Sequence, residues 1–309
     1  MTRKVPVAIA QVAPVYLNVG ESLKKAVAWI EKAATEGAKL ITFGETWLSG
    51  YPAWLDYCPN AALWDHEPVK QVFARMRQNS VSVPGPETDE LCRVAAALEV
   101  VVSIGINERV DSGPGNGTLY NTLLLIDSNG AIISRHRKLV PTYTERMVWG
   151  MGDGDGMESK NTQAGRIGGL ICWEHWMPLA RQVLHDSGED IHVAVWPSAH
   201  DVHQLASRHY AFEGRCFVVA TGMVMKVKDL PQELDLPAAT DGGAEEWLLR
   251  GGSAVIGPNG NYVAGPVFDQ ETIISAELDL TAVDREKMTL DVSGHYSRPD
   301  LFHLEFRKL

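Results

Sequence analysis

Short apolar runs rich in β-branched residues recur along the chain, and each is bounded by residues typical of turns. Each run has the length of a buried strand. Segments with helical spacing separate several of the runs, and this alternation predicts a layered α/β fold in which helices cover largely apolar sheets. The expected strands are 5–10, 40–43, 100–106, 122–126, 131–134, 167–171, 191–196 and 217–221, and the expected helices are 19–36, 87–98, 178–186 and 202–214.

Two Asn-Gly pairs, Asn129-Gly130 and Asn259-Gly260, each lie between strand-like runs. Tight hairpin turns favour residues that tolerate positive φ, so each pair predicts an antiparallel hairpin. The sheets are therefore expected to be mixed. The similar layout of the two hairpins points to two related sheets packed as a sandwich.

The composition is that of an ordinary globular protein, with 45% apolar and 22% charged residues. No stretch rich in Pro, Gly and Ser suggests a linker, so we expect one domain over residues 1–309. The formal net charge of -11 disfavours binding to nucleic acid or anionic membranes. Because the N-terminus lacks a long apolar stretch and no run of eighteen apolar residues occurs, we expect a cytoplasmic protein.

The four cysteines, at positions 58, 92, 172 and 216, include no C-x-x-C pair, so reduced thiols are expected. Cys172 follows the apolar run 167–171, shortly before the helix expected from Pro178. Backbone N–H groups and a helix dipole at such a place favour a thiolate. Free cysteines among apolar residues are also often packed core residues, so this position alone leaves both interpretations open.

Glu45 also lies at the end of an apolar strand, where partial burial can raise the pKa of a carboxyl group toward neutrality and make it a general base. The aromatic-rich segment 47–54 that follows resembles a pocket wall, although an exposed capping glutamate is the alternative. Lys138 ends the basic run 135–138 and can stabilise negative charge on a substrate. Basic runs are, however, usually solvated surfaces.

Two ion sites are weaker alternatives. His200, His203 and His209 with Asp201 have spacing that can place zinc ligands on one helix face, but no further ligand spacing supports that site. The acidic residues of 152–156 repel phosphate, and the spacing required for a calcium loop is incomplete there. We therefore expect no metal.

Three blocks carry a resemblance to a known family. FGETWLSGYP around Glu45, RHRKLVPTYTERMVWGMGDG around Lys138 and GGLICWEHWMPLAR around Cys172 resemble the signature blocks of the nitrilases in sequence, order and separation. Gly44 departs from the family, which commonly has proline there, and leaves the backbone less restrained. The similarity covers essentially the whole chain and continues through 193–200, 208–220, 251–266 and 295–302.

The resemblance implies a four-layer α-β-β-α sandwich with two mixed sheets flanked by helices. It also implies four catalytic residues, namely the general base Glu45, the electrostatic stabiliser Lys138, the nucleophile Cys172, and Glu145, which positions Lys138 and water. The implied reaction is hydrolysis of a nitrile by two waters to a carboxylic acid and ammonia, through a thioimidate and a thioester, with no cofactor. An amidase or carbamoylase is the alternative, although tryptophan after the cysteine favours a nitrile. A catalytically inactive binding protein is disfavoured because all four positions are filled.

The block CWEH at 172–175 resembles nitrilases that act on arylacetonitriles or aliphatic nitriles. Aromatic residues are expected to form a pocket for a phenyl or alkyl group, although each can equally belong to the core. The resemblance also implies at least a homodimer, paired through helices beside the active site. The candidate substrate-binding residues are Tyr51, Trp54, Trp173, His175, Trp176 and Trp196.

Overall fold

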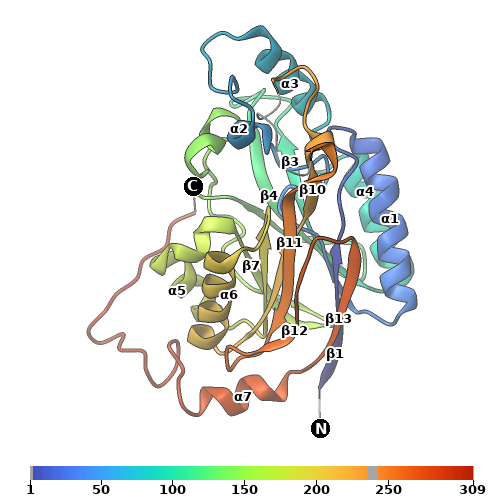
Figure 1. The fold of residues 1–309 in the computed structure, drawn as a ribbon. Coiled ribbons are helices and arrows are strands. Elements are labelled where there is room, and N and C mark those ends of the chain that lie inside the picture. The colour runs from blue at the N-terminus through green and yellow to red at the C-terminus, as the bar shows by residue number, and fades with distance from the viewer. Residues whose placement is uncertain (1–2, 236–242, 309) are drawn as a thin grey trace.

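The computed structural model describes residues 3–235 and 243–308. Within these residues, two mixed β-sheets pack face to face between two layers of helices (Figure 1). The predicted four-layer α-β-β-α sandwich is therefore confirmed. None of the described helices combines the length and the apolar character needed to span a bilayer.

Each sheet contains both parallel and antiparallel strand pairs. The first sheet has the order β13 (Thr272–Asp279), β1 (Lys4–Gln11), β2 (Leu40–Thr42), β3 (Val101–Arg109), β4 (Leu119–Ile126) and β5 (Ile132–Arg137). The second has the order β10 (Val224–Lys226), β11 (Trp247–Ile256), β9 (Phe217–Gly222), β8 (Ile191–Trp196), β7 (Gly165–Ile171) and β6 (Lys160–Thr162), with β12 (Tyr262–Phe268) paired to β11. All the strands predicted from the apolar runs are present.

The outer helices bury one apolar face each against a sheet. The helices are α1 (Val19–Thr35), α2 (Trp54–Tyr57), α3 (Glu67–Gln78), α4 (Pro86–Leu98), α5 (Pro178–Asp186), α6 (Asp201–Gly214) and α7 (Thr281–Lys287). α1 and α4 lie on the first sheet, and α5 and α6 lie on the second (Figure 1). α2, α3 and α7 were not predicted from the sequence, because α2 has a single turn and α3 and α7 have few buried residues.

Both Asn-Gly hairpins are confirmed, joining β4 to β5 and β11 to β12. Gly130 and Gly260 have φ values of 82° and 76°, which a glycine adopts without strain. In each turn the asparagine side chain accepts a hydrogen bond from the backbone N–H two residues later. Local turn chemistry therefore sets the position of both hairpins.

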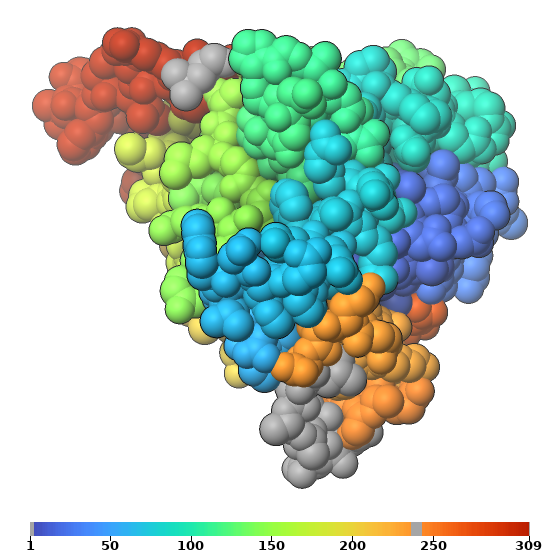
Figure 2. Space-filling model, turned by 90° about the horizontal axis from the view of Figure 1, so that it is seen from above, coloured from blue at the N-terminus to red at the C-terminus, as the bar shows by residue number. Residues whose placement is uncertain are grey.

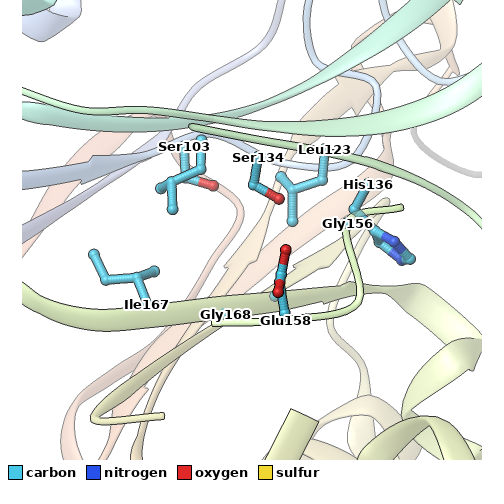
Figure 3. Close-up of a pocket in the computed structure, with 10 residues that line it drawn as sticks. Ser103, Leu123, Ser134, His136, Gly156, Glu158, Ile167 and Gly168 are labelled. Atoms are coloured by element: carbon cyan, nitrogen blue, oxygen red, sulfur yellow. The ribbon is translucent and has the colours of Figure 1, made fainter. Parts of the chain in front are cut away.

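The two sheets meet through apolar and small side chains. A small space of about 20 Å³ lies between them, enough for roughly one water molecule (Figure 3). Ser103, Leu123 and His136 from the first sheet face Ile167 and Gly168 of the second across this space. β2 is parallel to β3, and β3 and β5 are both antiparallel to β4, so the carboxyl ends of β2 and β5 lie at the same edge of the first sheet.

The segment that carries α2 and α3 lies against the segment before β11, shown in light blue and orange in Figure 2. Arg75 forms an ion pair with Glu233 at 2.7 Å across this contact. Tyr57, at the end of α2, donates a hydrogen bond to the Leu248 carbonyl oxygen at 3.4 Å. This contact builds one wall around the candidate site.

Candidate active site

Four side chains from three separate parts of the sequence meet at the edge of the two sheets. Glu45 follows β2, Lys138 follows β5, Glu145 lies in the 3₁₀ turn Tyr143–Met147, and Cys172 follows β7. Lys138 Nζ lies 3.0 Å from Glu45 Oε1 and 2.7 Å from Glu145 Oε2. Ligand atoms of Glu45, Glu145 and Cys172 lie within 4.8 Å of one another. All four side chains are buried.

Hydrogen bonds hold the two carboxylates in place. Asn121 Nδ2 donates to Glu45 Oε1 at 2.7 Å. The Tyr51 hydroxyl donates to Glu145 Oε1 at 3.0 Å, and the Thr142 backbone N–H donates to Oε2 at 2.7 Å. Glu45 Oε2 is buried and has no hydrogen-bond partner among the described residues, so it is free to accept a proton.

The charges of the cluster shift the pKa values of its members. Burial raises the pKa of Glu45 to about 7, against the opposing effect of Lys138. Burial alone would lower the pKa of Lys138, but Cys172, Glu45 and Glu145 together raise it. Burial and the Glu45 carboxylate raise the pKa of the Cys172 thiol well above its ordinary value, while Lys138 lowers it. A neutral thiol therefore lies beside a charged ammonium and a carboxyl group that titrates near neutrality.

The expected contribution of a helix dipole at Cys172 is corrected by the structure. Cys172 begins the 3₁₀ turn Cys172–Trp176 and α5 starts only at Pro178, so Cys172 lies outside the first turn of α5, where the dipole of a helix acts. The groups that lower the pKa of the Cys172 thiol are instead the Lys138 ammonium and, to a smaller extent, the Trp173 backbone N–H. The expected net lowering of the thiol pKa is outweighed by burial.

Three site segments contain strained backbone. Thr46, Tyr143 and Cys172 have φ values of 46°, 45° and 55°, in the left-handed region that residues with a Cβ rarely adopt. Such conformations cost on the order of 1–3 kcal/mol each and persist where the surrounding structure imposes them. The strain lies at or beside the residues of the cluster.

Glu174 is a buried residue that the sequence analysis does not assign to the site. Its carboxylate accepts hydrogen bonds from the backbone N–H groups of Leu139 and Ile171, each at 2.7 Å, and lies 2.8 Å from His136 Nε2. Burial alone would raise its pKa, but these partners lower it. Glu174 thus connects the backbone beside Lys138 with the backbone beside Cys172. An acidic residue within an apolar block was the only available sequence signal.

Two glycines allow the Glu45 segment to pack closely. A Cβ atom at Gly105 on β3 would lie 2.3 Å from the Gly44 carbonyl oxygen and from the Thr46 nitrogen. A Cβ atom at Gly44 itself would lie 3.2 Å from the Met223 backbone nitrogen. Tertiary packing therefore restrains the backbone before Glu45, where the sequence analysis expected less restraint.

A cavity of about 280 Å³ opens beside the cluster. Among the predicted substrate-binding residues, Tyr51 and Trp173 line it. Trp54, Trp196 and His175 are buried outside its lining, and Trp176 is exposed outside it. The lining residues that the sequence analysis does not name as substrate contacts are Asp56, Tyr57, Thr142, Tyr143, Thr144, Pro197, Ser198, His200, His203 and Leu249.

Neither alternative ion site forms in the described part of the chain. There, Glu45, Glu145 and Cys172 are the group of three potential metal ligands found close together, and it does not include the histidines of α6. The Lys138 ammonium already supplies a positive charge to that group. In the segment 152–156, Asp153 pairs with Arg137 at 3.0 Å, and the Gly152 N–H donates to the Lys138 carbonyl oxygen. This segment supports the backbone at Lys138.

Solved structures share this fold. A carbon-nitrogen hydrolase from Helicobacter pylori G27 is 19% identical, with a TM-score of 0.67 over 93% of this chain and 93% of that one. Nit3 of Saccharomyces cerevisiae, a member of branch 10 of the nitrilase superfamily, is 20% identical, with a TM-score of 0.65 over 95% of this chain and 97% of that one.

Curated relatives are more similar in sequence. "Nitrilase 2" from an unknown prokaryotic organism is 42% identical over 98% of this chain and 92% of its own length. The aliphatic nitrilase of Sinorhizobium fredii is 36% identical over 96% of this chain and 94% of its own length. A bifunctional nitrilase/nitrile hydratase of Nicotiana tabacum is 35% identical over 99% and 87%, respectively. The carbon-nitrogen hydrolase family model matches residues 6–287. This chain therefore belongs to the carbon-nitrogen hydrolase family and is a hydrolase.

Proposed function

We propose that this enzyme hydrolyses an organic nitrile, of the arylacetonitrile or aliphatic class, to the carboxylic acid and ammonia. The observation that carries the proposal is the buried cluster of Cys172, Glu45, Lys138 and Glu145 beside a cavity of about 280 Å³. The nitrilase names of the relatives support a nitrile as substrate. Tyr51 and Trp173 offer aromatic surface to its organic group.

The first half of the reaction forms a thioimidate. Glu45 Oε2 takes the thiol proton, and the Cys172 sulfur bonds to the nitrile carbon while one C–N π bond breaks. The nitrogen receives that proton by way of Glu45 and Lys138. The Lys138 ammonium and the Trp173 N–H stabilise the negative charge that develops, a contribution on the order of 3 kcal/mol per donor. Glu145 holds Lys138 in position.

The second half consumes two waters. Glu45 removes a proton from the first water as its oxygen bonds to the thioimidate carbon and the remaining C–N π bond breaks, and Glu45 passes this proton to the nitrogen. The hydroxyl proton of the adduct then also reaches the nitrogen by way of Glu45, the C=O bond forms, and the C–N bond breaks to release ammonia. The resulting thioester is attacked by the second water in the same way. The C–S bond breaks, the acid departs, and the sulfur regains its proton. If the C–S bond of the first tetrahedral adduct breaks instead, the product is an amide.

The test is turnover of phenylacetonitrile, mandelonitrile, an aliphatic dinitrile, benzonitrile and the matching amides by the wild type and Cys172→Ala. Ammonia is measured, and acid is separated from amide by chromatography. We expect acid from phenylacetonitrile or the dinitrile, and loss of all turnover in the folded variant. Turnover of amides alone would contradict the proposal and favour an amidase or carbamoylase with the same four residues.

A further inference from the structure

A chain of buried hydrogen bonds leads from Cys172 away from the cavity. His175 Nδ1 lies 2.7 Å from the Cys172 carbonyl oxygen, and His175 Nε2 lies 3.0 Å from His192 Nε2. His192 Nδ1 lies 2.7 Å from Glu189 Oε1, and the Tyr210 hydroxyl donates to Glu189 Oε2 at 2.5 Å. The four side chains that form these hydrogen bonds are each at most 4% exposed.

The number of hydrogen atoms that these buried hydrogen bonds require follows from their donors and acceptors. The three contacts from the Cys172 carbonyl through His175 and His192 to Glu189 each need one hydrogen, and the carbonyl can only accept. Two neutral imidazoles supply two hydrogens. The third must be an additional proton, shared among Glu189, His192 and His175. Without it, two lone pairs would face each other inside the protein, which is costly in a buried site.

The surroundings favour placing this proton on Glu189. Burial raises the pKa of Glu189 to about 7 and lowers the pKa values of His175 and His192 well below their ordinary range. Gly168 on β7 makes room for the carboxyl group, because a Cβ atom there would lie 2.1 Å from Glu189 Oε1. Trp196 stacks on the His175 ring with a centroid distance of 4.6 Å.

Other titratable and charged groups surround the chain. His185 of α5 lies 3.9 Å from Glu189 Oε2 and also pairs with Glu213 of α6. Cys216, just before β9, is a further electrostatic neighbour of Glu189. The histidines also interact with the charges of Glu174, His136 and Arg181.

One peptide group links the buried hydrogen bonds to the Cys172 sulfur. The Cys172 carbonyl, which accepts from His175, and the Trp173 N–H, which lowers the pKa of the Cys172 thiol, belong to the same peptide. A hydrogen bond to the carbonyl polarises the peptide and strengthens its N–H as a donor. The same bond restrains Cys172 in its left-handed conformation. The Trp173 N–H is one of the two groups proposed to stabilise anionic intermediates.

We propose that His175, His192 and Glu189 are positioning residues that share one proton and, through the Cys172–Trp173 peptide, support the reactivity of the Cys172 thiol. This inference rests on the proposed role of Cys172 as nucleophile. It assigns His175 a role behind the nucleophile, instead of in the substrate pocket.

The primary test is the rate of Cys172 alkylation by iodoacetamide, followed by mass spectrometry, because it requires no nitrile turnover. His175→Leu removes the donor to the Cys172 carbonyl, whereas His175→Asn can return one from its amide nitrogen. We expect the leucine variant to react about ten-fold more slowly and the asparagine variant to recover to within about three-fold of wild type. With the nitrile, we expect kcat to fall in parallel while KM changes little. A folded leucine variant with the wild-type alkylation rate would overturn this inference, and the proposed nitrile hydrolysis by Cys172 would still stand.

A second variant tests the proton count directly. In Glu189→Gln, the amide N–H₂ replaces the protonated oxygen and donates to His192, while the amide oxygen accepts from Tyr210. We expect this variant to match the wild-type alkylation rate near pH 6, and to exceed it by about two-fold or more near pH 9, where wild-type Glu189 has lost its proton. A ten-fold loss near pH 6 would overturn the inference, and this result does not depend on the folding of the leucine variant.

Discussion

One oxygen of the Glu45 carboxylate accepts a hydrogen bond from the Lys138 ammonium at 3.0 Å, while the other, Oε2, has no partner among the described residues. This arrangement suits a general base, because the hydrogen bond orients one oxygen and the other oxygen can take a proton. Burial raises the pKa of Glu45 to about 7, so its proton-accepting form becomes more abundant as the pH rises through this value.

We therefore predict that kcat/KM for the nitrile rises with pH up to about pH 7 and gains nothing beyond it, because Glu189 then loses the proton that supports the Cys172 thiol. Glu45→Gln keeps the size and the acceptor oxygen but cannot take the proton, and should lower kcat/KM by about 10²–10⁴-fold. Both results come from initial rates between about pH 5 and pH 9. A rise centred near the ordinary glutamate pKa, or a variant with wild-type kcat/KM, would contradict the assignment of Glu45.

Lys138→Met should destabilise the fold more at pH 8 than at pH 5. Without the ammonium, Glu45 and Glu145 are left buried with no cation between them, and breaking such a pair costs about 3–5 kcal/mol. Loss of the cation raises the folded-state pKa of Glu45 further, so its protonated form is tolerated at low pH and the stability is lost as the pH rises. Urea unfolding at both pH values measures the difference.

The matched control is Lys24→Met, which removes an exposed ammonium paired with Glu21 on α1. Exposed ion pairs contribute about 0–1 kcal/mol, so little change is expected at either pH. An equal loss of stability at both pH values in the Lys138 variant would argue against burial of the two carboxylates as its cause.

Glu174→Gln should lower both stability and kcat. One carboxylate oxygen becomes an N–H₂ group, which then faces the backbone N–H of either Leu139 or Ile171. A buried donor left without an acceptor costs about 1–3 kcal/mol. Because these two backbone groups adjoin Lys138 and Cys172, we expect kcat to fall as well. Unchanged unfolding and kcat would show that the connection does not matter for the reaction.

Gly105→Ala should displace the Glu45 segment, because the added Cβ atom would lie 2.3 Å from the backbone on either side of Glu45. Overpacking of this kind costs about 1–3 kcal/mol, and here it should also reduce kcat/KM. Gly20→Ala, in α1, is the control, since its Cβ has room and alanine favours a helix by about 0.5–1 kcal/mol. Thermal unfolding and nitrile turnover distinguish the two variants. Equal behaviour would refute the packing argument.

We propose that the chain forms at least a homodimer through the exposed face of α6. Val202, Leu205 and Phe212 are 50%, 61% and 48% exposed and lie at helical spacing on that face. Apolar patches of this kind often mark protein interfaces. Light scattering at micromolar concentration should give at least the dimer mass, and Leu205→Glu should lower it. A wild-type monomer would exclude the proposal.

Much of the fold could be predicted from local patterns. A few consecutive residues are enough to identify the apolar runs of β7 and β8 and the turn residues Gly130 and Gly260. Strand periodicity and positive φ are local properties of the sequence. α3 escaped prediction because only Val72 and Met76 of that helix are buried, which leaves a weak apolar pattern. The order of the three signature blocks also predicted the family.

The sequence alone thus determined the layered fold, its hairpins and the residue types available for chemistry. Only the tertiary structure decided how they meet: Glu45 and Lys138 are 93 residues apart in the chain, yet their side chains are in contact. It also placed Tyr51 on the cavity, Trp54 in the core and His175 behind Cys172. An aromatic or titratable residue has the same local sequence signal in a pocket or in a core, and the distinction arises from which distant segments pack against it.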